Sequence, residues 1–462
     1  MNATSRQEEI HRLTGEFDTA LQAVEDKVYT QPHSLEDVLL VLDRLRIQSE
    51  TAPFVNLLSL NLVSTEALCT RIAALYFKVL TDFNHKFDLR ALQYLCIQKR
   101  FITHVFEASG YQNLDALVGL LQRKAQALAQ KKQTAYLANQ GRLRALAITP
   151  MADLSTEDLV NLSLEEGELV ALLAIGFLLD RTPLSLTGEA NRKFLLEEFN
   201  PYEQLGSNPL YRHLAANVWM LCSYSAADHK HTVKKHLNAW FERYLKSKHV
   251  APKKVGETGD AKPTLVMVAE SFKSGHAMFR WYGPLIKRMQ QDYRMVLTGL
   301  PEDVDEQAKA LFDQYLEVPK DELNLQPILD AVQPDMVYFP SIGMRAWAIA
   351  LANLRWAPLQ IMSLGHPASS QSRHIDACLC GDRLFGGQQF FSENTLILDY
   401  GNWQPGRGPP QHATYPARAI ARKRIACGCS VPRHEVELSL CGSSQRHRTT
   451  SEQAAALHFF SE

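Results

Sequence analysis

Two histidines in the second half of the chain stand where a side chain could take part in chemistry. His276 follows the apolar run TLVMVAE and the short loop SFKSG, and His366 follows the apolar run LQIMSLG. An imidazole ring, whose unperturbed pKa is ~6.5, can accept a proton from an attacking nucleophile or hold an acceptor group in place. His276 stands at the predicted start of a helix, where a histidine can instead simply cap the helix or be solvated.

Small and turn-forming residues stand in the same kind of loop: Ser341, Gly343, Gly365 and Pro367. Glycine lets the backbone turn tightly or approach a ligand closely, and proline fixes the direction of the chain. Most such turns serve only to reverse the chain. Because open α/β sheets bind ligands at the carboxyl ends of their strands, we expect the loops that carry His276, Ser341 and His366 to converge on one edge.

The elements that would position these loops are short apolar runs separated by helical segments. The runs cover residues 264–270, 293–300, 336–341, 359–365, 375–381 and 395–399. Strands that are apolar on both faces and alternate with helices are typical of a parallel sheet covered on both sides. Residues 263–402 are therefore predicted to form a Rossmann-like α/β domain, in which the segment 304–316 is one of the helices.

The first half of the chain carries a helical pattern. Within residues 35–48, apolar side chains recur at steps of three and four and share one face: Leu35, Val38, Leu39, Leu42 and Leu45. Residues 1–245 are predicted to form an all-α N-terminal domain, and residues 246–262, rich in lysine, glycine and proline, a linker. Neither the helical spacing nor the short apolar runs of strands continue in residues 403–462. We therefore expect an irregular tail, either disordered or produced by a shifted reading frame.

Composition and charge exclude several classes of protein. A chain of 462 residues with 46% hydrophobic and 21% charged residues is typical of a globular protein with about two to four domains. Its formal net charge of -1 gives no general attraction for nucleic acid or for an anionic membrane. The longest apolar run, residues 169–179, is shorter than the ~20 residues of a membrane-spanning helix and predicts a buried core helix.

Several patterns indicate a cytoplasmic protein that holds no metal and no cofactor. The N-terminal sequence is polar and acidic where a secretory signal is basic and then apolar. None of the eight cysteines stands in a Cys-X-X-Cys spacing, and no GxGxxG or P-loop pattern is present. The histidine-rich segment 228–236, DHKHTVKKH, lacks ligand spacing and carries lysines that repel a cation, so it is interpreted as a solvated helix start.

Several segments, taken in order, resemble a known family: ESFKSGHAMFR, YFPSIGM, LRWAPLQIMSLGHPASSQSRHID and FFSENTLIL. They are similar to the cytoplasmic bacterial N-glycosyltransferases of the high-molecular-weight adhesin glycosyltransferase type. These enzymes belong to glycosyltransferase family 41 and are relatives of the O-linked N-acetylglucosamine transferases. The resemblance is strong over residues 200–399 and weaker over the earlier helices.

The resemblance implies a GT-B enzyme, in which two Rossmann-like halves face each other. Such an enzyme transfers glucose or a similar hexose from a UDP-sugar to asparagine in Asn-X-Ser/Thr sequons of an adhesin-like polypeptide. It requires no metal, because helix dipoles and side chains of the second half offset the diphosphate charge. His276 matches the family's motif histidine, a base or acceptor-positioning residue. The substrate-binding residues that the resemblance implies are Ser274, Ser341, Gly343, Gly365, His366 and Pro367.

The sequence departs from the family after residue 399. Relatives continue into a second Rossmann half of about 150–200 residues, which carries most of the UDP-binding groups. Residues 403–462 do not resemble it, so we expect a truncated chain that binds a UDP-sugar only if the missing half is supplied. The alternative is a catalytically inactive fragment that acts at most as a peptide- or partner-binding module. An O-linked transferase is a weaker third reading, since the N-terminal helices lack a tetratricopeptide pattern.

Overall fold

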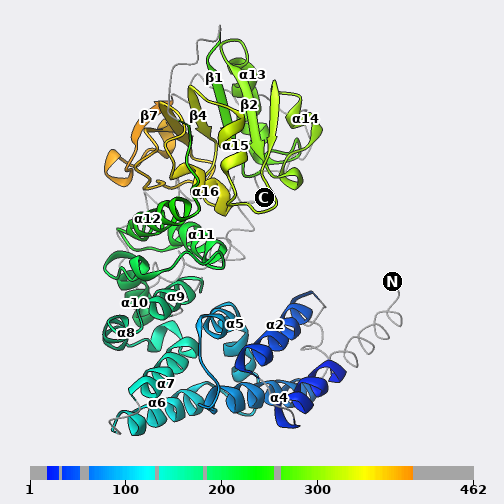
Figure 1. Cartoon of the computed structure of the whole chain (residues 1–462), viewed down its shortest axis with the longest axis vertical. Helices are drawn as coiled ribbons and strands as arrows, with labels where there is room; N and C mark the ends of the chain where they lie inside the picture. Colours follow the sequence, from blue (N-terminus) through cyan, green and yellow to red (C-terminus); the bar gives the residue numbers. More distant parts are fainter. Residues whose placement is uncertain are drawn as a thin grey trace, which may run out of the picture. The chain divides into compact units, whose positions relative to one another are not determined.

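The computed structural model describes residues 18–30, 34–51, 62–130, 135–180, 185–253 and 262–398 (Figure 1). The chain divides into two compact units, Met1–Leu195 with Phe199–Leu205, and Leu196–Glu198 with Gly206–Glu462. The irregular tail predicted for residues 403–462 lies outside the described residues, and so does the part of the predicted linker from 254 to 261.

The first unit is helical throughout the part that the structure describes. Residues 18–30 are helical, and the α-helices that follow are α2 (Leu35–Thr51), α4 (Leu62–Thr81), α5 (Leu89–Glu107), α6 (Asp115–Ala129), α7 (Ala135–Ile148), α8 (Thr156–Ser163), α9 (Gly167–Leu178) and α10 (Leu186–Glu197), the last of which ends in the second unit. The apolar face predicted for α2 is confirmed, because the five side chains that define this face are buried. No helix among the described residues has the length and apolar character to cross a bilayer.

Helix α9 is the buried core helix that the longest apolar run predicts. All of its residues from Val170 to Leu178 are buried. Gly176 lets α5 approach closely, since a Cβ atom at this position would lie 2.4 Å from the Sγ atom of Cys96. Close packing of α5 on α9 therefore depends on the absence of a side chain at Gly176.

The second unit contains a seven-stranded parallel sheet with the order β3-β2-β1-β4-β5-β6-β7. The strands are β1 (Thr264–Val268), β2 (Arg294–Gly299), β3 (Gln314–Glu317), β4 (Met336–Phe339), β5 (Leu359–Ser363), β6 (Ala377–Gly381) and β7 (Asn394–Leu398). This arrangement confirms the prediction of a Rossmann-like α/β fold that follows a helical region. It places the carboxyl ends of all these strands at one edge.

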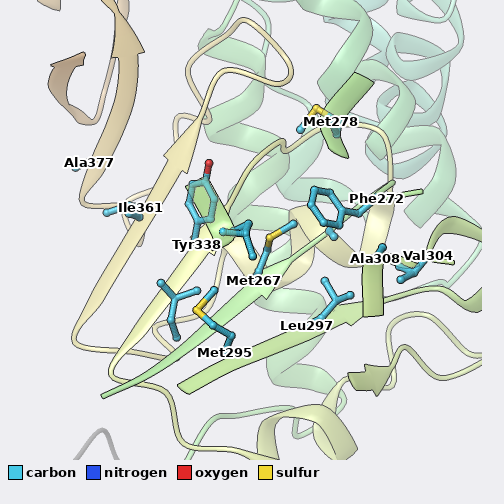
Figure 2. Packing of buried hydrophobic residues seen from close by; sticks show 13 residues of the cluster. Met267, Phe272, Met278, Met295, Leu297, Val304, Ala308, Tyr338, Ile361 and Ala377 are labelled. Carbon is cyan, nitrogen blue, oxygen red and sulfur yellow. The ribbon is translucent and has the colours of Figure 1, made fainter. Parts of the chain in front are cut away.

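Both faces of the sheet are covered, as the apolar strands predict. On one face a buried cluster joins the strands to α13 (Ala277–Met289) and α14 (Glu306–Lys309), and Figure 2 shows Met267, Leu297 and Met278 within it. Val266 and Val268 alternate with Met267 along β1 and are also completely buried. Successive side chains of a strand point to opposite faces, so β1 is shielded from water on both sides.

Strand β3 corrects the sequence analysis, which predicts a single helix over residues 304–316. Helix α14 ends at Lys309, and β3 begins at Gln314 and forms the edge of the sheet beside β2. Its side chains are only partly buried. The strand therefore lacks the continuous apolar run that marks the inner strands, and it resembles the end of an amphipathic helix.

Two helices that precede the predicted linker pack in the same unit as the sheet. Helices α11 (Tyr211–Leu221) and α12 (Thr232–Ser247), which the sequence assigns to the N-terminal domain, belong to the compact unit of the sheet. Both contact α16 (Ala346–Ala352), whose residues are all buried. The second unit also contains the short helix α15 (Gln326–Ala331) and the 3-10 turn η3 (Cys222–Tyr224).

Candidate active site at the carboxyl edge of the sheet

His276 is the N-cap of α13, in the loop that follows β1. Its Nδ1 atom accepts a hydrogen bond from the backbone N–H of Met278 at 3.3 Å. Burial and the nearby Arg280 lower the pKa of His276 below its ordinary value, against the opposing effect of Asp303. The ring is therefore neutral at pH 7, and with Nδ1 accepting, its proton lies on Nε2. The capping role that the sequence allows is present in the structure.

Ser274 ties the loop after β1 to the loop after β2. Its backbone N–H and its hydroxyl both donate to the Oδ2 atom of Asp305, at 2.8 Å and 2.6 Å. Asp305 in turn caps the start of α14 by accepting from the N–H of Ala308. The hydroxyl of Ser274 is thus engaged within the protein, and its geometry favours a role in shaping the loop that holds His276.

A buried carboxylate that the sequence analysis does not single out joins two of the strand-end loops. Glu270 follows β1, and its Oε1 atom accepts hydrogen bonds from the backbone N–H groups of Gly343, Met344 and Arg345 at 2.9, 2.8 and 2.9 Å. These three residues lie between β4 and α16. One side chain therefore fixes the backbone of the loop after β4.

Burial raises the pKa of Glu270 to about 7, although the three N–H groups and the nearby Ser341 act in the opposite direction. The sequence does contain a signal for this residue: it is the one acidic residue of the apolar run TLVMVAE. Carboxylates are rarely buried without a partner. An acidic residue at the end of an inner strand is thus a candidate for holding neighbouring backbone N–H groups.

Gly365 brings the loops after β4 and β5 together. Its backbone N–H donates to the carbonyl oxygen of Pro340 at 3.0 Å. A Cβ atom on Gly365 would lie 2.6 Å from that same oxygen and 2.6 Å from the Cε atom of Met278 in α13. Because the loops after β1, β4 and β5 all meet here, the predicted convergence is confirmed.

Gly343 occupies a position that only glycine suits. Its φ angle is +143°, a region that side chains disfavour. An added Cβ atom would lie 2.9 Å from the Trp219 ring and 3.4 Å from Cδ2 of His366. The backbone of the β4 loop thus lies directly against the histidine that follows β5.

His366 is buried and held by residues that precede the sheet. Its Nε2 atom shares a hydrogen bond of 2.9 Å with the hydroxyl of Ser223, and its ring lies near the rings of Trp219 and Tyr224. Burial and the charge of Lys234 lower the pKa of His366 to about 3. The ring is neutral at pH 7, so it can exchange hydrogen bonds but is a weak base. Pro367, the next residue, is exposed.

The structure therefore brings together most of the residues that the sequence singles out. The residues Ser341, Gly343, Gly365 and His366 lie in adjoining loops. Helix α13, which His276 caps, lies against Gly365 through the side chain of Met278. The structure shows where these residues lie. Their roles in substrate binding and catalysis remain predictions. Among the described residues, no group of histidine, cysteine, aspartate or glutamate side chains could hold a metal ion.

The interpretation of residues 228–236 as a solvated helix start is wrong for part of the segment. Asp228 and His229 are exposed, but Val233 and Lys234 are completely buried. The reason is that Lys234 lies on the face of α12 that packs inside the second unit, together with Val233 and Leu237.

Residues 161–245 match the family model described as HMW1 domain 2. Two curated relatives from Actinobacillus pleuropneumoniae, of serotype 5b and serotype 7, are both named UDP-glucose:protein N-beta-glucosyltransferase, and each is 26% identical over 345 residues. The chain is thus similar to the HMW1-type glycosyltransferases. The alignment with each HMW1-type relative covers 71% of this chain and 55% of the relative, so the chain spans about half the length of these proteins.

A solved structure is also similar to this chain. It is a mutant of the O-GlcNAc transferase of Thermobaculum terrenum, with 18% sequence identity and a TM-score of 0.33, and the match covers 62% of this chain and 57% of that one. The segment that matches the HMW1 model includes α11, η3 and α12, and hence Trp219, Ser223 and Lys234. The segment that matches this family model thus supplies side chains that surround His366.

Proposed function

We propose that this chain is the acceptor-side half of a GT-B protein N-glycosyltransferase that uses a UDP-hexose. Together with a second Rossmann half, it transfers the hexose, glucose by analogy with the relatives, to asparagine in Asn-X-Ser/Thr sequons of an adhesin-like polypeptide. The observation that carries the proposal is the meeting of the loops after β1, β4 and β5, with His276 at the start of α13. The names of the relatives support the donor and the linkage to nitrogen.

In the proposed reaction the amide nitrogen of the acceptor asparagine forms a bond to the anomeric carbon of the hexose. The bond between that carbon and the phosphate oxygen of UDP breaks, its electron pair leaves with UDP, and the amide nitrogen releases one proton to solvent. Neutral His276, with Nδ1 bonded to the N–H of Met278, can donate from Nε2 to the amide oxygen of the asparagine. This arrangement favours a role for His276 in holding the acceptor rather than in removing its proton, because a base needs an unprotonated nitrogen.

The donor side of the proposal rests on the family resemblance. Groups of a second Rossmann half, including helix N-termini, bind the UDP diphosphate, and no metal or other cofactor takes part. The acceptor is an adhesin-like polypeptide, and the reaction takes place in the cytoplasm. Ser341, Gly365 and Pro367 line the acceptor on the side of the sheet edge, as the resemblance implies.

Two measurements test the proposal: transfer from radiolabelled UDP-glucose to a peptide with one Asn-X-Ser sequon, with the second Rossmann half of a relative joined to this chain, and binding of that peptide by fluorescence anisotropy. We expect His276→Asn, which keeps a capping side chain, to abolish transfer. The matched control is His104→Ala, since His104 is an exposed histidine of α5 in the other unit. Peptide binding without any transfer would favour the alternative, a peptide-binding module. A chain that neither binds nor modifies the peptide would refute both.

A further inference from the structure

The loop that carries His366 is held by buried charges on both of its sides. The backbone turns sharply after His366, where the N–H of Ala368 donates to the carbonyl oxygen of His366 at 2.8 Å. The next two residues, Ser369 and Ser370, are almost completely buried. Buried loops must satisfy their backbone polar groups within the protein. The partners of these two serines therefore decide the position of the loop.

The first partner is Lys234, a completely buried lysine of α12. Its Nζ atom donates a hydrogen bond to the carbonyl oxygen of Ser369 at 2.9 Å and lies 3.9 Å from the centre of a Trp219 ring. Burial lowers the pKa of Lys234 to about 8, while the nearby Cys222 and Glu393 act in the opposite direction. A buried ammonium group is costly, so its retention calls for a specific contact.

The second partner lies four residues along the same helix. Asn238 donates from Nδ2 to the carbonyl oxygen of Ser370 at 3.0 Å. Its Oδ1 atom accepts from Nε1 of Trp219 at 2.8 Å and from Nδ2 of Asn353 at 3.0 Å. The spacing of four residues places Lys234 and Asn238 on one face of α12. Side chains from successive turns of the helix therefore donate to successive carbonyl groups of the loop.

The third partner is Glu393, which immediately precedes β7 and is also buried. Its Oε2 atom accepts from the hydroxyl of Ser369 at 2.8 Å, and its Oε1 atom accepts from the N–H of Ser370 at 2.8 Å and from the hydroxyl of Ser370. Lys234 thus donates to a carbonyl group of the loop, and Glu393 accepts from its hydroxyl groups and from a backbone N–H group.

We infer that Lys234 and Glu393 are positioning residues that together fix the loop of His366 against η3, where Ser223 bonds the ring. The geometry of the carboxyl edge then depends on α12, a helix of the segment that matches the HMW1 model. That this loop faces the acceptor rests on the proposed function, whereas its fixation by the two charges does not.

Amide hydrogen exchange of the full chain tests the inference, with β1 as an internal reference. We expect Lys234→Met, which keeps the length of the side chain but removes its donor, to speed exchange across residues 365–373 at least about fivefold. Exchange in Thr264–Val268 should remain unchanged. Lys234→Arg, which keeps a charged donor, should restore at least half of the lost protection. Lys235→Met is the matched control, because Lys235 is the exposed neighbour on the same helix.

A second readout follows the histidine itself. The ring nitrogen NMR signals of His366, identified by their loss in His366→Gln, should shift in Lys234→Met and remain in place in Lys235→Met. Unchanged exchange and unchanged ring signals in folded Lys234→Met would overturn the inference. Equal acceleration in β1 and the loop would also overturn it, because it would indicate general destabilisation. If Lys234→Met shows no cooperative melting, the same comparison is made with Glu393→Ala, and the same outcomes decide.

A final arm separates this inference from the proposed function. Binding of the Asn-X-Ser peptide is measured for the unmodified chain and for Lys234→Met. Weaker binding by the variant supports the link between the loop and the acceptor. A chain that binds no peptide counts against the proposed function, while the exchange experiment still decides whether Lys234 and Glu393 position the loop.

Discussion

The Oε1 atom of Glu270, at the end of β1, accepts a hydrogen bond from the backbone N–H of Gly343, after β4, at 2.9 Å. The same oxygen accepts from the next two N–H groups. Replacing Glu270 by alanine would leave three N–H groups without this acceptor, and we expect it to destabilise the second unit by at least about 2 kcal/mol. Urea unfolding, followed by tryptophan fluorescence, measures the loss. A variant as stable as the parent chain would contradict this account.

The titration of Glu270 makes stability depend on pH. Burial raises the pKa of Glu270 from 4.5 to about 7 in the folded chain, so the folded state holds the proton more tightly than the unfolded state. Its contribution to stability is complete below pH 4.5 and is lost as the pH rises through 7. We expect Glu270→Gln, which cannot titrate, to remove roughly 1–3 kcal/mol of this pH dependence. Urea unfolding at pH 5 and pH 8 tests the difference, which would be the same in both proteins if Glu270 did not titrate.

Gly365 should not tolerate any side chain. A Cβ atom there would approach the carbonyl oxygen of Pro340 to 2.6 Å, and a backbone oxygen cannot easily move away. We expect Gly365→Ala to lower the stability of the second unit by about 1–3 kcal/mol. Gly275→Ala is the control, since no atom would lie within 4 Å of its Cβ atom. Equal melting temperatures for the two variants would show that the loops do not pack as described.

Protonation of His276 should weaken the start of α13. Burial lowers the pKa of His276, so the neutral, capping form persists to a more acidic pH than for an ordinary histidine. Below that pKa the Nδ1 atom binds a proton and can no longer accept from Met278. We expect the exchange of the Met278 amide, corrected for its intrinsic rate, to quicken as the pH falls through this lowered pKa. In His276→Asn this dependence should be absent, because asparagine caps at any pH.

Gly176 offers a parallel test in the first unit. Its replacement by alanine would place Cβ 2.4 Å from the sulfur of Cys96, and we expect a loss of about 1–3 kcal/mol in that unit. Gly119→Ala, in α6, is the control, because its Cβ atom would meet only the flexible end of Arg123. That variant should be neutral or more stable by about 0.5–1 kcal/mol. Calorimetry compares the two, and the reverse order would refute the packing of α5 on α9.

Much of the sheet could be predicted from the sequence, because inner parallel strands leave continuous apolar runs. The convergence of the loops follows from the same logic, since parallel strands send their carboxyl ends to one edge. Strand β3 could not be predicted in this way, because an edge strand such as Gln314–Glu317 is only half buried. Continuous apolar runs in the sequence identify strands only where both faces of the sheet are covered.

The side chains that hold the site were harder to foresee than the loops themselves. Lys234 stands among lysines and histidines in DHKHTVKKH, and only the fold shows that it is the buried one. Its partner Ser369 lies 135 residues away in the chain. Contacts over such separations depend on which helix packs where, and local patterns carry no information about them. Glu270 is the exception, since an acidic residue that ends an apolar strand is visible in the sequence.

The strand order gives the bond of Glu270 a wider meaning. From β1 the chain winds outward in one direction through β2 to β3, then returns to the centre and winds in the other direction from β4 to β7. The crevice between the two windings, at the ends of β1 and β4, is where open α/β sheets bind their ligands. Glu270 spans the ends of these two strands. The point at which the chain reverses its winding is thus held by a single side chain, which fixes the backbone of the loop after β4.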